Sequence, residues 1–210
     1  RESGPGTAAE GALYTTEGVV LDARYRFAVA VEGADDCLPE RFRLRLGGDG
    51  RAADMEPARV AWPEPDYAAL ARAGRFRLIL TAPALFPKGW RLPGQADDGT
   101  VTFAGASARV VAAAVPRHDV ASGWDIYEGR PKPAQRFVPA GAVYWIADYT
   151  GDADQLAGLV HRGVPVTPEA GDAPPDEADG PVRDIADRKA EGFNTVLLAA
   201  WPQDRNDSSR

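Results

Sequence analysis

Apolar and polar residues alternate one by one over short runs of this chain, and this pattern constrains the fold more than any other feature. The longest run extends from Val19 to Val31, where apolar or aromatic residues occupy every second position. A period of two places successive side chains on opposite faces of a strand, so we expect one long, half-buried strand here. A second alternating run, Phe42 to Leu46, has arginines on its polar face and predicts another strand.

The remaining segments are richer in strands than in helices. Expected strands cover residues 76–81, 101–103, 109–115, 137–146 and 196–201. Expected helices cover residues 66–73 and 152–161, followed by Gly74 and Gly163, and a third helix runs from Pro181 to Gly192. The order is not a regular alternation of strand and helix. It therefore favours an α+β fold with a mainly antiparallel sheet and few helices.

The expected domain covers residues 11–201. Residues 1–10, rich in Gly, Pro and Ala, and the polar residues 202–210 are expected to be flexible ends. Residues 168–181 contain acidic residues and prolines but no Lys or Arg, which predicts a mobile acidic insertion. The first residues show neither an initiator Met nor the apolar core of a signal peptide, so we expect a fragment or a processed piece.

The chain of 210 residues has a net charge of −7, which by itself argues against nucleic-acid binding. No apolar run approaches the roughly 20 residues of a membrane helix. Cys37 is the only cysteine, so an internal disulfide and a cysteine zinc cluster are both excluded. These features fit a cytoplasmic protein, and we expect no cofactor and no metal.

One basic segment stands out from this acidic background. Arg130, Lys132 and Arg136 lie in and just beyond a proline-stiffened loop, directly before the strand expected at residues 137–146. A strand that presents a rigid cationic loop suits an anion or a nucleic-acid backbone, whereas the alternative is an ordinary solvated surface loop. Trp124, just ahead of the loop, is a candidate for core packing or for stacking on a base. Trp90, Trp145 and Trp201 are core candidates.

Few residues suggest catalysis. His161 lies near the end of a predicted helix, where a positive charge complements the helix dipole. His118, in a loop, is a candidate general acid or base of a metal-independent ribonuclease, with Tyr127 or Lys132 as its partner. The run Gly47 to Gly50 lacks the Lys-Ser/Thr ending of a phosphate loop. It predicts a hairpin turn or a loop that lets a ligand backbone approach closely.

Seven short segments, in a fixed order, carry a resemblance to a known family. They are Gly11–Thr15, Leu46–Arg51, Leu80–Phe86 with Gly89–Trp90, Ser122–Asp125, Lys132–Pro133 with Arg136, Val138–Tyr144, and Glu191–Phe193 before a strand ending in Trp201. With these segments the chain resembles the third subunit of the Cmr-type (type III-B) CRISPR effector complex, in the RAMP superfamily. The resemblance covers most of this chain but only the later part of the family's length. Members carry a further N-terminal region with the first RRM-like domain.

The resemblance implies a ferredoxin-like (RRM-like) RAMP domain with insertions. It implies a non-catalytic subunit for antiviral defence that caps the guide RNA, binds its 5′ tag, docks the large polymerase-like subunit and contacts the backbone subunit. The RNA-binding residues that follow from the family pattern, together with the basic loop, are Arg130, Lys132, Arg136, Trp124, Gly47, Gly48, Arg51, Gly192 and Phe193.

Three positions depart from the family pattern. Asn194 stands where a second glycine is expected, and Ala200 replaces the glycine before Trp201. If this loop touches RNA, we expect these side chains to limit the approach of its backbone. Asp49 stands where the family often has Glu, a milder change. Two other functions stay open: a metal-independent RAMP endoribonuclease that uses His118, and a structural subunit that contacts only protein.

Overall fold

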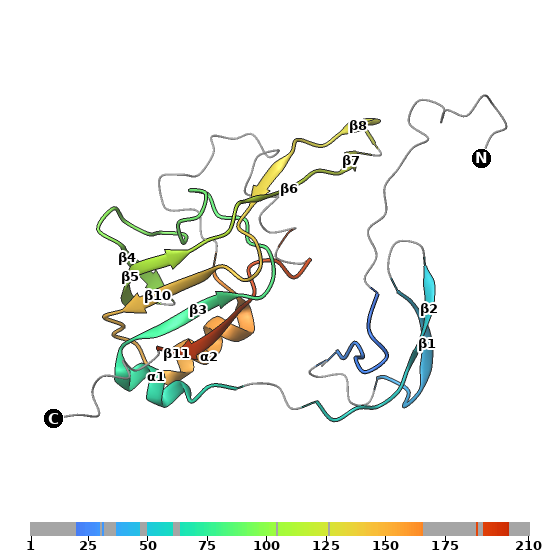
Figure 1. The fold of residues 1–210 in the computed structure, drawn as a ribbon, viewed down its shortest axis with the longest axis horizontal. Helices are drawn as coiled ribbons and strands as arrows, with labels where there is room; N and C mark the ends of the chain where they lie inside the picture. The colour runs from blue at the N-terminus through green and yellow to red at the C-terminus, as the bar shows by residue number, and fades with distance from the viewer. Residues whose placement is uncertain are drawn as a thin grey trace. The chain divides into compact units, whose positions relative to one another are not determined.

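The computed structural model describes residues 20–29, 31, 37–46, 50–60, 64–103, 105–125, 127–165, 188 and 191–201 (Figure 1). The chain divides into two compact units, residues 1–63 and 64–210, so the predicted domain 11–201 spans both. The predicted flexible ends and the acidic insertion 168–181 lie outside the described residues. So does most of the helix predicted from Pro181 to Gly192.

Among its described residues, the first unit contains one β-hairpin. Strand β1 (Phe42–Leu46) pairs antiparallel with β2 (Arg51–Met55). Gly50 has φ 62°, a left-handed conformation that glycine adopts without steric cost. The pairing confirms the strand predicted at Phe42–Leu46 and the hairpin interpretation of the glycine run, although residues 47–49 themselves lie outside the described part.

The long strand predicted from Val19 to Val31 is wrong for the described residues of that run, 20–29 and 31. They form a loop with a turn, in which the Tyr25 N–H donates to the Asp22 carbonyl oxygen at 2.9 Å. Val20 and Phe27 are exposed by 94% and 65%. A strand requires a hydrogen-bonded neighbour, and none of the described residues pairs with this run. Alternation of apolar and polar residues is therefore not sufficient to predict a strand, because it does not show whether a neighbouring strand is present.

The second unit is built on a five-stranded sheet with the order β11-β3-β10-β5-β4. Its strands are β3 (Phe76–Leu80), β4 (Thr100–Phe103), β5 (Ala106–Ala114), β10 (Val143–Ala147) and β11 (Val196–Ala200). Every neighbouring pair is antiparallel. The predicted mainly antiparallel sheet with few helices is confirmed.

Both described helices begin and end within one residue of the bounds that the sequence predicts. In α1 (Tyr67–Ala73) the Asp66 carboxylate accepts the Ala69 N–H at 2.8 Å, and Gly74 ends the helix with φ 61°. In α2 (Ala153–Arg162) Asp152 and Gln155 form a reciprocal capping box. Helix α2 connects β10 to β11, which are parallel to each other on either side of β3, so these elements form a split β-α-β unit.

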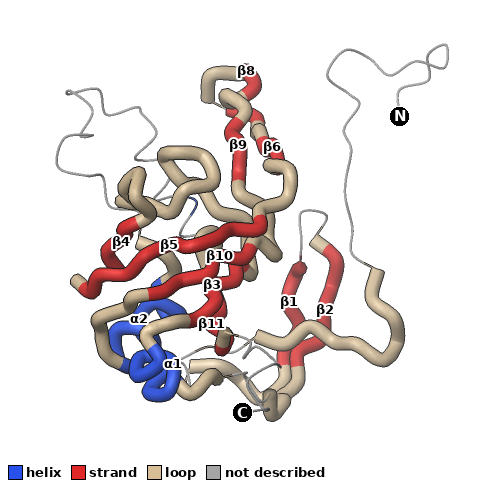
Figure 2. The backbone as a smooth tube through the Cα atoms, turned by 60° about the vertical axis from the view of Figure 1, so that its left-hand side comes forward, coloured by secondary structure: helices blue, strands red, loops and turns tan. Residues whose placement is uncertain are grey.

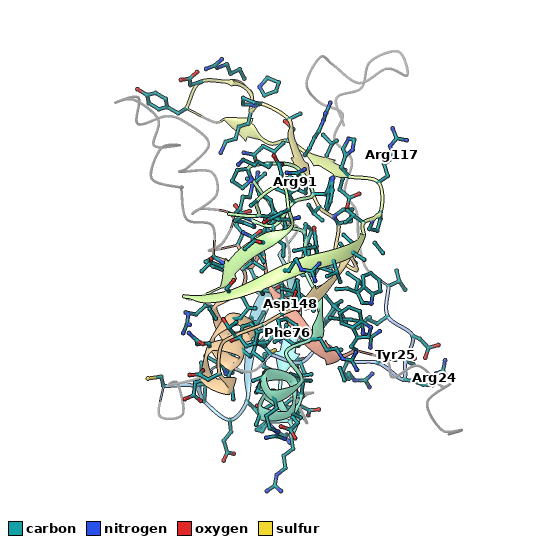
Figure 3. All side chains as sticks on the ribbon, turned by 90° about the vertical axis from the view of Figure 1, so that its left-hand side faces the viewer. Arg24, Tyr25, Phe76, Arg91, Arg117 and Asp148 are labelled. Atoms are coloured by element: carbon teal, nitrogen blue, oxygen red, sulfur yellow. The ribbon has the colours of Figure 1, made fainter. Side chains whose placement is uncertain are left out.

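The core lies between one face of the sheet and the helices. Leu78 is fully buried and pairs with Tyr144 on one side and Leu198 on the other, which places these three side chains on the same face. Leu70 of α1 and Leu156 of α2 belong to the same cluster. Phe76 lies between the sheet and the helices (Figure 3).

Trp90 departs from the expectation that it is a core residue. Its side chain is 49% exposed. Its carbonyl oxygen nevertheless accepts a hydrogen bond from the buried Tyr144 hydroxyl at 2.5 Å. The backbone at this position therefore satisfies a core residue, whereas the indole lies outside the core. Burial raises the pKa of the Tyr144 phenol.

Candidate nucleic-acid interface

The basic segment is a two-stranded ribbon rather than a loop. Residues 117–137, named here the basic ribbon, leave the sheet after β5 and return to it at β10. Strand β6 (Asp119–Ala121) pairs with β9 (Gln135–Phe137), and β7 (Trp124–Asp125) pairs with β8 (Arg130–Pro131). The ribbon extends from the sheet on the side away from α1 and α2 (Figure 2). It therefore presents its basic residues well outside the core.

The middle of the ribbon is held by short-range hydrogen bonds. The Lys132 N–H donates to the Gly123 carbonyl oxygen at 2.8 Å, and the Ser122 hydroxyl donates to the Lys132 carbonyl oxygen at 2.6 Å. Pro131 and Pro133 flank Lys132 and have no N–H to donate. These bonds and the two fixed proline φ angles hold the backbone of Lys132 in place.

The cations of the ribbon differ in how far their charge is compensated. Arg130 forms an ion pair with Glu128, with 2.5 Å between Nε and Oε2. Arg117, Lys132 and Arg136 are exposed, and within the described part of the chain they form no ion pair. Arg117 points outward from the turn after β5 (Figure 3). The ribbon thus carries cations that no described residue pairs with, in an acidic protein.

The two faces of the ribbon have different surroundings. Arg136 is opposite Val120 in the register, and both side chains are exposed. Gln135 and Phe137 lie on the other face, and Phe137 is only 2% exposed. Because neighbouring residues of a strand point to opposite faces, burying Phe137 directs Arg136 toward solvent.

Three segments meet where the ribbon joins the body: residues 83–85, residues 135–138, and residues 188 and 191–194 before β11. We name this junction the ribbon root. Ala84 and Val138 exchange two backbone hydrogen bonds, both of 2.8 Å. The Asn194 N–H donates to the Pro83 carbonyl oxygen at 3.0 Å, and the Asn194 side-chain oxygen accepts the Leu85 N–H at 2.9 Å. The loop before β11 and the base of the ribbon are therefore tied to the same short segment.

The strand predicted over residues 137–146 is wrong as one element, because it is divided at this junction. Strand β9 ends at Phe137 and β10 begins at Val143. Between them, Val138 bridges to Ala84, and Gly141 has φ 84°. Pro139 and Gly141 interrupt the extended backbone, and the chain turns there from the ribbon into the sheet.

Of the segments that carried the family resemblance, Leu80–Phe86, Val138–Tyr144 and Glu191–Phe193 meet at and beside the ribbon root. Ser122–Asp125 and Lys132–Pro133 lie on the ribbon, and Leu46–Arg51 belongs to the first unit. The family described as CRISPR-associated protein (Cas_Cmr3) matches residues 1–201. The chain belongs to this family. It is accordingly a Cmr3-type subunit of the type III-B CRISPR complex. No curated protein matches the chain.

Asn194 does not obstruct the loop of this Cmr3-family chain in the way its sequence suggested. It has φ 65° and is 1% exposed, with its side chain turned into the protein toward Leu85. The space where a Gly192 side chain would stand is empty of described atoms, and Gly192 has φ 90°. The outer side of the loop therefore remains a bare backbone, despite the asparagine.

The other predicted RNA-binding residues of this Cmr3-family chain fall into three places. Arg130, Lys132, Arg136 and Trp124 lie on the basic ribbon. Gly192 and Phe193 lie at its root, where the Phe193 ring contacts the Phe137 ring with 5.1 Å between centroids. Arg51 begins β2 of the first unit, and Gly47 and Gly48 lie outside the described residues.

The candidate acid–base partners are not brought together. His118 precedes β6 at the base of the ribbon, whereas Lys132 is bonded to Gly123 beyond β6, and Tyr127 follows β7 near the tip. Across the described residues, no group of three or more His, Cys, Asp or Glu side chains is placed to hold a metal ion. None of the described helices is long and apolar enough to cross a membrane.

Two basic residues of the site were missed by the sequence analysis. Arg117 lies at the base of the ribbon, and its position beside the basic loop was the only available signal. Arg188 lies in a segment predicted as a helix, yet its guanidinium contacts Phe137 and Gln135, about fifty residues earlier in the chain. No local pattern encodes such a long-range contact.

Proposed function

We propose that this chain is a non-catalytic subunit that caps the guide RNA of a type III-B complex, and that the basic ribbon binds the RNA backbone at the 5′ tag. The observation that carries the proposal is a set of exposed cations on a ribbon that projects from an acidic protein: Arg117, Lys132 and Arg136, none of which pairs with a described acidic residue. Family membership supplies the type of assembly. Docking to the large polymerase-like subunit, contact with the backbone subunit and a cytoplasmic location belong to the same proposal.

The chemistry of the ribbon suits a single-stranded RNA backbone. Lys and Arg neutralise phosphates, and contacts to phosphates position an RNA without reading its sequence. Ordering a flexible cationic loop would cost conformational entropy on binding, whereas the hydrogen bonds around Lys132 already restrict the ribbon. The bare backbone at Gly192 offers a second place where an RNA backbone can approach closely.

The absence of catalysis is also part of the proposal. Acid–base cleavage of RNA requires both groups within hydrogen-bond reach of the reacting atoms. His118 and Tyr127 lie at opposite ends of the ribbon, which favours a binding role over an endoribonuclease. The ferredoxin-like description of the RAMP domain is proposed on the split β-α-β unit of β10, α2 and β11.

Charge reversal on the ribbon tests the proposed function. In the assembled complex, Lys132→Glu with Arg136→Glu should weaken guide-RNA binding by on the order of tenfold, because two phosphate contacts are lost. The slope of log affinity against log salt concentration should fall by about 0.7 for each lost contact. Arg72→Glu, an exposed residue in the last turn of α1, is the matched control and should leave both quantities unchanged. Unchanged affinity in the double variant would refute the proposal.

Arg130 provides an internal comparison. Because Glu128 already compensates its charge, Arg130→Ala should weaken RNA binding less than Lys132→Ala in the same titration. Equal losses would show that the ion pair opens when RNA binds.

A further inference from the structure

Arg188 occupies a central position at the ribbon root. Its guanidinium carbon lies 5.5 Å from the ring centroid of Phe137 and 5.5 Å from that of Phe193. The two rings contact each other at an interplanar angle of 49°. One ring comes from strand β9 of the ribbon and the other from the loop before β11. A cation over two aromatic faces attracts both, so Arg188 holds the two segments against one another.

Hydrogen bonds fix the same arrangement. Arg188 Nε donates to Gln135 Oε1 at 3.1 Å, and one terminal nitrogen donates to Glu191 Oε2 at 2.7 Å. The Arg188 carbonyl oxygen accepts the N–H groups of Glu191 at 3.1 Å and of Phe193 at 3.0 Å. The side chain thus reaches the ribbon while the backbone holds the loop. With only 23% of its side chain exposed, Arg188 is poorly placed to bind a phosphate itself.

The ribbon needs such an attachment. Strands β6 and β9 pair over three residues, and β7 and β8 over two. Isolated two-stranded ribbons are marginally stable in water. The Ala84–Val138 bridge is one attachment of the ribbon to the body. The contacts of Arg188 with Gln135 and Phe137 are another. Arg136, between them in sequence, points to the opposite face, so any tilt of β9 moves its charge directly.

We infer that Arg188 is a positioning residue: it clamps the basic ribbon to the loop 191–194 and so holds Lys132 and Arg136 in one orientation toward the guide RNA. The inference rests on the proposed function for its biological purpose, but the clamp itself concerns only this chain. Lysine cannot replace arginine here, because the clamp uses a guanidinium that lies near two rings and donates in two directions at once.

Amide hydrogen exchange on the full chain without RNA tests the clamp alone. Arg188→Ala should accelerate exchange at residues 119–121 and 135–137 about tenfold, because the ribbon then opens locally. Amides of β3 and β10 should keep their protection, which shows that the fold is intact. Arg188→Lys should behave like Arg188→Ala, and Arg72→Ala should behave like the parent chain. Unchanged exchange in the ribbon would overturn the inference.

A milder variant guards against loss of the fold. Gln135→Ala removes the acceptor of Arg188 Nε but leaves both rings and the cation in place, and its side chain is only half-buried. It should accelerate exchange in the same residues by a smaller factor. An effect confined to other parts of the chain would overturn the inference.

Guide-RNA binding in the assembled complex tests the positioning role. Arg188→Ala should lower affinity several-fold while preserving the salt slope, because the phosphate contacts remain but cost more to order. Faster exchange with unchanged affinity would overturn the positioning role. In that case the Lys132→Glu/Arg136→Glu variant decides separately whether the ribbon binds RNA at all, so failure of the clamp and failure of the proposed function are distinguishable.

Discussion

At the scale of single residues, Asn194 shows how a side chain that looks obstructive in the sequence can turn inward and leave the loop backbone accessible. The family pattern expects glycine there, and a left-handed conformation explains why. Asparagine adopts this conformation more readily than other non-glycine residues. It also supplies a side-chain oxygen to the half-buried Leu85 N–H, an interaction that glycine lacks.

Replacing Asn194 tests this explanation. Asn194→Ala should destabilise the protein by about 2 kcal/mol, because the Leu85 N–H loses its acceptor and alanine disfavours a positive φ. Asn194→Gly should cost less, since glycine accepts the backbone conformation. Urea denaturation measures both. Guide-RNA affinity should not rise in the glycine variant, because the asparagine side chain already faces inward; a rise would contradict the inward placement.

At the scale of elements, the sequence predicted the helices and strands that are specified by nearby residues. Helices α1 and α2 were expected from Asp66, Gly74, Asp152 and Gly163, because capping is a short-range interaction. Strands β1, β3 and β11 followed from their apolar patterns. The failures share one cause. The run from Val19 to Val31 has an ideal alternation but no described partner, and the basic loop became a ribbon through pairing that its composition does not reveal.

Shortening the ribbon tests its role as one element. Replacing residues 122–134 by Asn-Gly joins the closing pair Ala121–Gln135 through a two-residue turn of favoured type. The sheet and its core should be retained, with a Tm within about 4 °C of the parent, because no core residue is removed and a larger shift would mean a loss above about 1 kcal/mol. Guide-RNA binding should weaken, since Lys132 is lost. A shortened ribbon that binds RNA like the parent would place the contact elsewhere.

At the scale of the whole molecule, the basic residues proposed to bind RNA lie on a projection, while the acidic balance of the chain comes from other parts. The net charge of the chain is negative, whereas the basic ribbon carries exposed cations. The distribution of charge along the chain therefore indicated the ribbon better than the net charge did. The core residues that the structure describes all lie in the second unit, from which the ribbon extends. A packed sheet that presents a cationic ribbon fits the proposed place at the end of a guide RNA.

Crosslinking tests this account most directly. A photoreactive guide RNA, labelled at its 5′ tag and assembled into the complete effector complex, is irradiated, and the crosslinked peptides of this chain are identified by mass spectrometry. We expect crosslinks within residues 117–137, lost when Lys132→Glu and Arg136→Glu are combined. Crosslinks to this chain that avoid the ribbon, or none to this chain while neighbouring subunits crosslink efficiently, would contradict it.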